Sequence, residues 1–517
     1  MDKRTTIPGS DLWIVTLWLI IACVSQTEAQ TINRIDSLVN TAYENYELSG
    51  NVLIAKNGSI IYQKSFGYAD LAKKKLVGEH TTFQLASVSK KFTSVAILQL
   101  MERRKLALDD RVNKYLPALR FENVTIRHLL THTSGLVDFQ VFERPYFADT
   151  SNVFSNKDLV AAINDYDKPL LFTPGEKWSY SNSGYGLLAL IVEKVSGESF
   201  ESYLLQHVFQ PSGMKHTYIG STPNVIDDNN RAKGYDYLDY APWILQRSDS
   251  LQRNRIELHN LGGLVGQGNV ISTVADLLAF DRALYGTKLL RQSTLQEAFT
   301  PTRLTNGEFA STGWKNTAAY YGLGWMILQD STYGKVVFHT GGISGAVTAF
   351  IRNVTRDQTV IVLNNVTHRG THAIAVNLLT SLNGGLIWKD KISAARVYAR
   401  QLFKSDRDAA LATFNAIKSD TARYYLDERE MNMLGLSMVY NDHQEKGIEM
   451  LRLNTLLYPN SANVYDSYAE ALLRAGKKQE ATLMYKKSVN LNPQNQSGIN
   501  ALKKLQENNN YDCRSPQ

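Results

Sequence analysis

The sequence contains few cysteines and no long basic tract. Only Cys23 and Cys513 occur in 517 residues, so a disulfide framework cannot hold this fold together and a hydrophobic core must do so. Lysine and arginine outnumber aspartate and glutamate by 56 to 49, which gives a formal net charge of +7. No basic stretch, however, is interleaved with aromatic residues as on a nucleic-acid surface. These absences argue against a disulfide-stapled protein and against nucleic-acid binding.

Metal and nucleotide motifs are also missing. His128 and His132 lie four residues apart on an expected helix, as zinc ligands can, but the residues between them lack the glutamate of a zinc-protease motif. The glycines of residues 261–273 do not spell Gly-x-Gly-x-x-Gly between a strand and a helix. We therefore expect no metal and no cofactor.

The main apolar run stands at the N-terminus. Two basic residues precede an almost unbroken apolar run from Leu12 to Val24, and small residues follow up to Ala29. This pattern is typical of a signal peptide, and the run is short for a membrane span of about 20 residues. We expect residues 1–29 to be a signal peptide and the mature protein to be secreted or periplasmic. An uncleaved anchor stays open, as does a lipid anchor on Cys23, which ends a lipoprotein-like box.

Strand and helix signals indicate an α+β domain over residues 30–390. The region around Asn57-Gly58 alternates between apolar and polar residues, which is a hairpin signal. Helical stretches fill the middle, and β-branched and aromatic segments return between about 320 and 365. Strands at both ends with helices between them predict one antiparallel sheet flanked by helices.

The C-terminal part, residues 391–517, is expected to be all-helical. Tyr458-Pro459-Asn460 recurs thirty-four positions later as Asn492-Pro493-Gln494, and small residues recur at the same offset. This period is typical of tetratricopeptide repeats, with two copies at about 430–463 and 464–497. Two repeats rarely form an independent array, so they either bind a protein partner or buttress the preceding domain.

A serine and a lysine stand at the expected start of a buried helix. Ser87 and Lys90 are three residues apart and would share one helix face, where the helix N-terminus favours a developing negative charge. Lys90 can accept the serine proton only if burial or a nearby cation lowers its pKa from about 10.4. Taken alone, the pair is better explained as a capping serine with a surface lysine.

Two further segments change that balance. Tyr180-Ser181-Asn182 lies between a loop and a buried helix, where the phenol can act as a base or an acid and Asn182 can hold a substrate. His339, Thr340, Gly341 and Gly342 end an expected strand. The glycines there would let a substrate backbone approach closely. Each segment alone is also ordinary core or turn sequence.

Together the motifs resemble the serine β-lactamase and penicillin-binding-protein-like superfamily. The resemblance is to the branch that includes class C β-lactamases and D-alanyl-D-alanine carboxypeptidases, and it covers about residues 35–385 in the family's order. The matching segments are "FQLASVSKKFTSVAILQL", "TIRHLLTHTSGL", "FTPGEKWSYSNSGYGLLALIVEKVSG", "PSGMKHT", "STVADLLAF", "YGLGW" and "FHTGGISG".

The resemblance implies acyl-serine catalysis on a small ester or peptide. Ser87 would be the nucleophile, and Lys90 and Tyr180 would share the base role, with one of them later protonating the leaving group. The backbone N–H groups of Ser87 and Gly342 would form the oxyanion hole. His339 would complete the catalytic set, and Asn182 would orient the substrate and bind it together with Thr340, Gly341 and Gly342.

One residue departs from many members of that superfamily. His339 stands where they carry a lysine, and a histidine with a reference pKa near 6.5 is mostly neutral at pH 7. Anionic β-lactams and D-Ala-D-Ala termini would lose part of their anchor. We therefore expect an esterase or peptidase rather than a β-lactamase. A catalytically silent protein that binds cell-wall peptide or a partner is the alternative.

Overall fold

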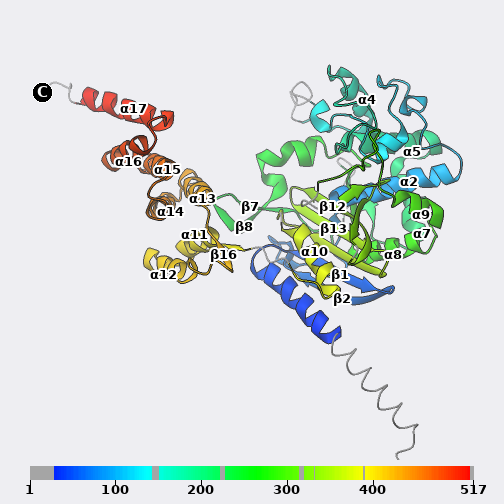
Figure 1. Ribbon diagram of the computed structural model, residues 1–517, viewed down its shortest axis with the longest axis horizontal. Coiled ribbons are helices and arrows are strands. Elements are labelled where there is room, and N and C mark those ends of the chain that lie inside the picture. Colours follow the sequence, from blue (N-terminus) through cyan, green and yellow to red (C-terminus); the bar gives the residue numbers. More distant parts are fainter. Residues whose placement is uncertain are drawn as a thin grey trace, which may run out of the picture. The chain divides into compact units, whose positions relative to one another are not determined.

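The computed structural model describes residues 28–142, 151–221, 228–313, 319–330, 332–368, 370–387 and 391–512 (Figure 1). They fall into two compact units, one within Met1–Asp236 and Arg247–Trp388 and the other within Tyr237–Gln246 and Lys389–Gln517. Residues 1–27, which hold nearly all of the expected signal peptide, lie outside the described part. Within that part, no helix has the length and apolar character needed to cross a membrane.

The first unit is built on a seven-stranded antiparallel sheet with the order β10-β11-β12-β13-β14-β1-β2. Its strands are β1 (Gly50–Lys56), β2 (Ser59–Phe66), β10 (Ala319–Tyr321), β11 (Met326–Asp330), β12 (Gly334–Ile343), β13 (Ala346–Asn353) and β14 (Gln358–Asn364). The first strand pairs with the last one, with Gly50 opposite Asn364. The blue and yellow-green strands of Figure 1 lie side by side for this reason. The predicted antiparallel sheet made from both ends of the domain is confirmed.

The two faces of the sheet bury two separate cores. Val52 and Ile54 of β1 pack with the helix of residues 28–44 and with α10 (Thr371–Leu382). Leu53 and Ala55, which point to the opposite face because strand side chains alternate, belong to the larger core on the other side. The predicted turn at Asn57-Gly58 joins β1 to β2, and both of its residues have positive φ angles.

The larger core carries the helices that surround the site. Its main helices are α2 (Lys90–Glu102), α3 (Ile126–Leu130), α4 (Asn156–Asp165), α5 (Asn182–Ser196), α6 (Phe200–Leu204), α7 (Gln210–Ser212), α8 (Val274–Tyr285) and α9 (Gln292–Ala298). The short turns are η1 (Ala86–Ser89), η2 (Val112–Lys114), η3 (Phe139–Val141), η5 (Leu205–Phe209), η6 (Ser248–Ser250), η7 (Gln252–Asn254) and η8 (Ile256–Asn260). The short strands are β3 (Tyr68–Asp70), β4 (Lys75–Leu76), β5 (Phe83–Gln84), β6 (Tyr218–Ile219) and β9 (Val270–Ser272).

The second unit is helical apart from short strands. Its helices are α11 (Ala394–Lys404), α12 (Arg407–Ile417), α13 (Glu428–Tyr440), α14 (Gln444–Leu457), α15 (Ala462–Arg474), α16 (Lys478–Leu491) and α17 (Gln496–Asp512). Its strands are β15 (Ile392–Ser393) and β16 (Tyr424–Tyr425), with most of the hairpin of β7 (Tyr235–Leu238) and β8 (Ala241–Arg247). The all-helical character expected after residue 391 is confirmed. That the hairpin tip groups with these helices was not foreseen from the sequence.

The small residues of the thirty-four-residue period lie where paired helices touch. A Cβ added to Gly435 of α13 would come within 2.6 Å of Leu451 Cγ, and one added to Gly447 of α14 would come within 2.5 Å of Gly435 O. Ala469 and Ala481 stand one period later in α15 and α16, and both are fully buried. The small residues that recur in the sequence therefore lie at two close helix–helix contacts.

Candidate active site

Ser87 lies in the turn η1, directly before α2. Ala86 has a positive φ of 49°, a conformation that costs about 1–2 kcal/mol for a residue other than glycine. Ser89, and not Ser87, is the N-cap residue of α2, and its hydroxyl accepts a hydrogen bond from the Val270 N–H. Lys90 is fully buried. The alternative of a capping serine with a surface lysine therefore does not describe this segment.

Lys90 is held between three oxygen atoms. Its Nζ lies 3.3 Å from Ser87 Oγ, 2.6 Å from Asn182 Oδ1 and 2.9 Å from the backbone oxygen of Gln267. Burial lowers the pKa of Lys90 to about 7, and the negative charge of Asp138 acts in the opposite direction. A substantial fraction of the lysine is therefore neutral near pH 7, and its lone pair is within reach of the serine proton.

Asp138 fixes the side chain of Asn182. Its Oδ1 accepts the backbone N–H of Asn182 at 2.6 Å and that of Ser183 at 3.1 Å, and its Oδ2 accepts Asn182 Nδ2 at 2.9 Å. The amide must then present Oδ1 to Lys90. Sequence reasoning missed Asp138 because it stands outside every recognisable motif. The only available signal was its place six residues after His132.

Tyr180 lies over the same lysine. Lys90 Nζ is 4.7 Å from the centroid of the Tyr180 ring. Burial raises the pKa of Tyr180 above its ordinary value, and a side-chain hydrogen bond with Ser87 opposes that rise. The phenol therefore keeps its proton at neutral pH, so of the two groups expected to share the base role, only Lys90 is ready to accept a proton.

A directed chain of hydrogen bonds runs behind the site through His132, Tyr321 and His339. The Ser181 N–H donates to His132 Nδ1 at 3.1 Å, so the His132 proton is on Nε2, which lies 3.2 Å from the Tyr321 hydroxyl. That hydroxyl lies 3.1 Å from His339 Nε2, and His339 Nδ1–H donates to the backbone oxygen of Thr340 at 2.7 Å. We assign the tautomers from these partners. Both rings are neutral, and each nitrogen has a partner.

His339 is therefore a buried neutral group and not an open cation. Its exposed fraction is 1%, and burial together with the charge of Lys90 lowers its pKa to about 3. Its ring centroid is 6.5 Å from that of Tyr180, so it borders the site on the Tyr180 side. The catalytic role that we expected for His339 would have to be exerted through Tyr321 and Thr340, because its own nitrogens are occupied.

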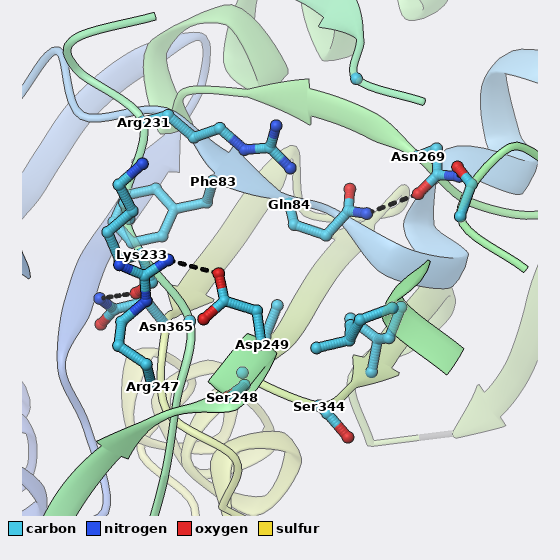
Figure 2. A pocket seen from close by; sticks show the side chains of 18 of the residues that line it. Phe83, Gln84, Arg231, Lys233, Arg247, Ser248, Asp249, Asn269, Ser344 and Asn365 are labelled. Atoms are coloured by element: carbon cyan, nitrogen blue, oxygen red, sulfur yellow. Dashed lines mark hydrogen bonds and ion pairs between the residues drawn. The ribbon is translucent and has the colours of Figure 1, made fainter. Parts of the chain in front are cut away.

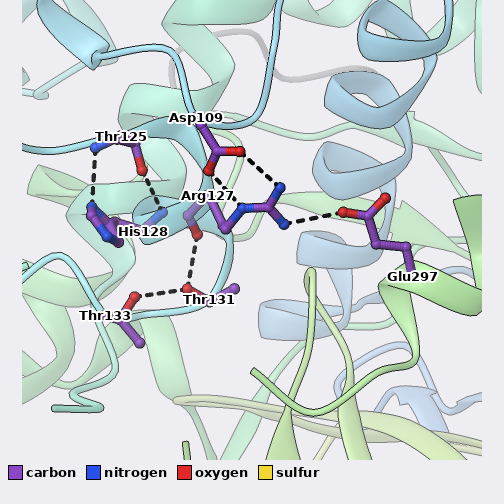
Figure 3. A network of polar contacts seen from close by, with 7 residues as sticks. All are labelled: Asp109, Thr125, Arg127, His128, Thr131, Thr133 and Glu297. Carbon is purple, nitrogen blue, oxygen red and sulfur yellow. Dashed lines mark hydrogen bonds and ion pairs between the residues drawn. The ribbon is translucent and has the colours of Figure 1, made fainter. Parts of the chain in front are cut away.

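Figure 3 shows a polar network formed by the residues on either side of His132, in which Thr131 contacts Thr133 and the backbone oxygen of Arg127. His132 has a φ of 59°, and the hydroxyls of its neighbours Thr131 and Thr133 lie 2.8 Å apart. His128 instead caps α3, where its Nδ1 accepts the N–H of Thr125 at 3.3 Å. The two histidines thus have separate partners. Within the described residues, no cluster of three or more histidine, cysteine, aspartate or glutamate side chains could hold a metal ion.

The strand β12 meets the serine turn through Gly341. A Cβ on Gly341 would come within 2.3 Å of Leu85 O and 2.4 Å of Thr348 Oγ1, so only glycine fits between the strand and η1. A Cβ on Gly342 would meet nothing within 4 Å, so Gly342 borders open space. Gly341 thus packs against the segment that carries Ser87, and the substrate-binding role of Thr340, Gly341 and Gly342 stays a prediction.

Comparison with known proteins gives consistent matches. The Beta-lactamase family model matches residues 35–382. Penicillin-binding protein 4* of Bacillus subtilis strain 168 is 36% identical over 336 residues, which cover 64% of this chain and 71% of that protein. The solved penicillin-binding protein from Bacillus halodurans gives a TM-score of 0.56 at 29% identity, covering 67% of this chain and 98% of that one.

A second solved structure gives a similar match. The D-stereospecific amidohydrolase from a Streptomyces species has a TM-score of 0.52 at 25% identity, covering 66% of this chain and 95% of that one. Ser87, Lys90, Tyr180 and His339 all fall inside the matched residues. Because the family model spans well over half of the sequence, the chain belongs to the beta-lactamase family of serine hydrolases.

Proposed function

We propose that this hydrolase cleaves an ester or amide bond through an acyl intermediate on Ser87. The observation that carries the proposal is the buried lysine, whose Nζ lies 3.3 Å from Ser87 Oγ and whose pKa burial lowers to about 7. A lysine in solution would be protonated at this pH and unable to accept the proton. Burial therefore converts Lys90 into a base that is competent at neutral pH.

In the first step, neutral Lys90 takes the proton of Ser87 while Oγ forms a bond to the carbonyl carbon. The carbonyl electron pair moves to oxygen, where the backbone N–H groups of Ser87 and Gly342 stabilise the negative charge. As the bond to the leaving group breaks, the Tyr180 hydroxyl gives that group a proton and regains one from Lys90. Water then attacks the acyl carbon by the same route, and Ser87 recovers its proton.

The substrate that fits best is a peptide or amide with a D-configured residue, with esters as simpler substrates. Support comes from the names of two relatives, a D-stereospecific amidohydrolase and a penicillin-binding protein, each similar over most of this domain. The neutral His339 supplies no positive charge for a carboxylate on the leaving group. An amide with a neutral leaving group is therefore favoured over one that ends in a free carboxylate.

The test is hydrolysis of D- and L-alanine 4-nitroanilides by the wild-type protein and by Ser87→Ala. We expect turnover of the D form, a slower rate for the L form and none in the variant. Equal rates for the two forms would contradict the stereochemical part. Turnover that survives in Ser87→Ala would contradict the acyl-serine mechanism.

We also propose that the chain is exported and that its helical unit contains two tetratricopeptide-like repeats. Support for export is the N-terminal apolar run with small residues after it. Support for the repeats is the period of thirty-four together with the close helix pairs at Gly435 and Gly447. Mass spectrometry of the protein from the exported fraction tests the first part. We expect the exported protein to have a new N-terminus near residue 30, or to begin at an acylated Cys23 in the lipid-anchored form.

A further inference from the structure

A polar cavity of about 390 Å³ begins next to the serine site (Figure 2). Phe83 and Gln84 line it just before η1, and residues 343–346 line it just after Gly342. Gln84 donates to Asn269 Oδ1 at 2.7 Å, which links the cavity wall to the loop that supplies an oxygen to Lys90. The cavity therefore lies beside the turn that carries Ser87, at the end of β12 that follows Gly342.

The position of the proton donor tells which part of a substrate would reach this cavity. A general acid must lie within hydrogen-bond reach of the leaving atom, so the leaving group lies toward Tyr180. The Tyr180 ring packs against His132 at 4.3 Å and lies 6.5 Å from His339, at the earlier end of the segment 339–342. The acyl part then extends the other way along β12, past Gly342 to Ile343 and Ser344.

Three cationic and three anionic side chains line the cavity. Whether it favours a negatively or a positively charged ligand therefore depends on which of these side chains already have partners within the protein. The cations are Arg231, Lys233 and Arg247, and the anions are Asp228, Asp249 and Glu257. Figure 2 shows Arg231, Gln84 and Asp249 projecting into the same space.

Each carboxylate already accepts protein donors. Asp228 accepts from the hydroxyls of Thr82 and Tyr218 and from a backbone N–H. Asp249 pairs with Arg247, and Glu257 accepts the Ser344 N–H at 3.1 Å.

The cationic side chains of the cavity have fewer hydrogen-bond partners within the protein than its carboxylates have. Across the described ranges, the Lys233 ammonium has no hydrogen-bond or ion-pair partner, although its backbone is fixed by the Ala69 oxygen and by Asn365 Nδ2. Arg231 lies near Asp228, whose oxygens are shared with the three donors above. A lysine ammonium carries three N–H donors and no acceptor. The cavity therefore has spare donors, which a carboxylate would complement.

We infer that the acyl part of the substrate carries a carboxylate, which Lys233 and Arg231 bind in this cavity. The inference rests on the proposed acyl-serine function. Only when the substrate carbonyl lies at Ser87 Oγ does the position of Tyr180 determine that the acyl part, and not the leaving group, faces the cavity. It places the anion anchor on the acyl side of Ser87, whereas the His339 side offers no cation. Lys233 and Arg231 are then specificity-determining residues.

The test uses paired 4-nitrophenyl esters of equal length. The monoesters of adipic and pimelic acid carry a terminal carboxylate, and the hexanoate and heptanoate esters are their neutral counterparts. We expect the wild-type protein to show kcat/KM about tenfold higher for the acid of at least one pair, the size of one charge-assisted contact. Lys233→Gln and Arg231→Gln should each move that ratio toward one, and Lys233→Arg should preserve it.

Lys157→Gln, on the exposed surface of α4, is the matched control and should leave the ratio unchanged. Thermal unfolding shows whether each variant is folded. Efficient turnover of the neutral esters without a preference for the acids would overturn the inference and leave the proposed function standing. A preference that both glutamine variants retain would also overturn it. No turnover of any ester, with no adduct on Ser87, would overturn the proposed function and this inference together.

Discussion

At the scale of single residues, the environment decides which lysine acts as a base. Lys90 and Lys91 are adjacent and buried, and burial lowers the pKa of each to about 7. Lys91 Nζ, however, donates to the backbone oxygen of Phe350 at 3.1 Å and lies over the Phe350 ring. The sequence predicted Lys90 through its spacing from Ser87, but only the structure shows that Lys90 alone of this pair contacts the serine.

This difference predicts contrasting effects of two similar substitutions. Lys90→Met should lower the acylation rate by about 10²–10⁴, the usual contribution of a general base. Lys91→Met should keep most of the rate but lower the unfolding temperature, because the Phe350 oxygen loses its donor. Stopped-flow acylation and thermal unfolding measure the two effects. Equal losses of rate in both variants would contradict the assignment of Lys90.

The acylation rate should depend on pH through Lys90. Burial lowers its pKa to about 7, so the rate should rise with pH as the proton leaves, with a midpoint near that value. The charge of Asp138 keeps this pKa from falling further. Asp138→Asn should therefore move the rising limb to lower pH, as a pH–rate profile would show. A shift to higher pH would contradict the electrostatic role of Asp138.

Tyr321→Phe tests the hydrogen-bond chain. The change removes one oxygen and leaves Nε2 of both His132 and His339 without a partner. We expect a loss of about 1–3 kcal/mol in the free energy of unfolding and a lower kcat with little change in KM. Denaturant unfolding and steady-state kinetics measure these. Full stability and full kcat would show that the chain has no positioning role.

At the scale of elements, the site depends on how closely β12 approaches η1. Gly341→Ala would place a methyl group against Leu85 O and Thr348 Oγ1, whereas Gly342→Ala would place one in open space. We expect Gly341→Ala to destabilise the fold by about 1–3 kcal/mol and Gly342→Ala to leave the free energy of unfolding nearly unchanged. Urea unfolding of both variants checks this. An equal stability of the two would contradict the packing of β12 on η1.

The elements that the sequence predicted are those with strong local signals. Asn57-Gly58 carried a hairpin signal, and α2 and α5 appeared as apolar periods that the structure buries. The hairpin of β7 and β8 was not foreseen, because β7 has only four residues and β8 carries a proline at its second position. Ser87, Lys90 and Tyr180 could be found through motifs. Asp138 reaches the site only through tertiary packing, which no local pattern encodes. Tyr321 opens the matched segment "YGLGW", but its contacts with His132 and His339 appear only in the structure.

At the scale of the whole molecule, the second unit is not simply a C-terminal extension. Residues 237–246 belong to it, and Tyr240 and Trp243 pack against Phe403 there. A boundary at residue 390, which follows the change in sequence pattern, separates this hairpin from its aromatic partners. The composition along the chain cannot show that this hairpin belongs to the second unit, because the contact joins residues more than 150 positions apart.

Truncation after residue 387 should therefore expose apolar surface. Tyr240 and Trp243 would lose Phe403 and the ring of His443, so we expect the shortened chain to bind a hydrophobic dye and to aggregate. Tyr240→Ser with Trp243→Ser should restore part of its solubility. Light scattering of the shortened chain, with and without these changes, provides the measurement. A shortened chain as soluble as the full one would contradict this packing.

The central claim is that Ser87 is an activated nucleophile, and intact-mass analysis with a fluorophosphonate tests it most directly. The full chain and its Ser87→Ala variant would be treated in parallel after thermal unfolding has shown that both are folded. We predict one adduct per wild-type chain and none on the variant. A folded wild-type chain that forms no adduct, or a variant that is labelled equally, would contradict the account and favour a protein that binds its ligand without cleaving it.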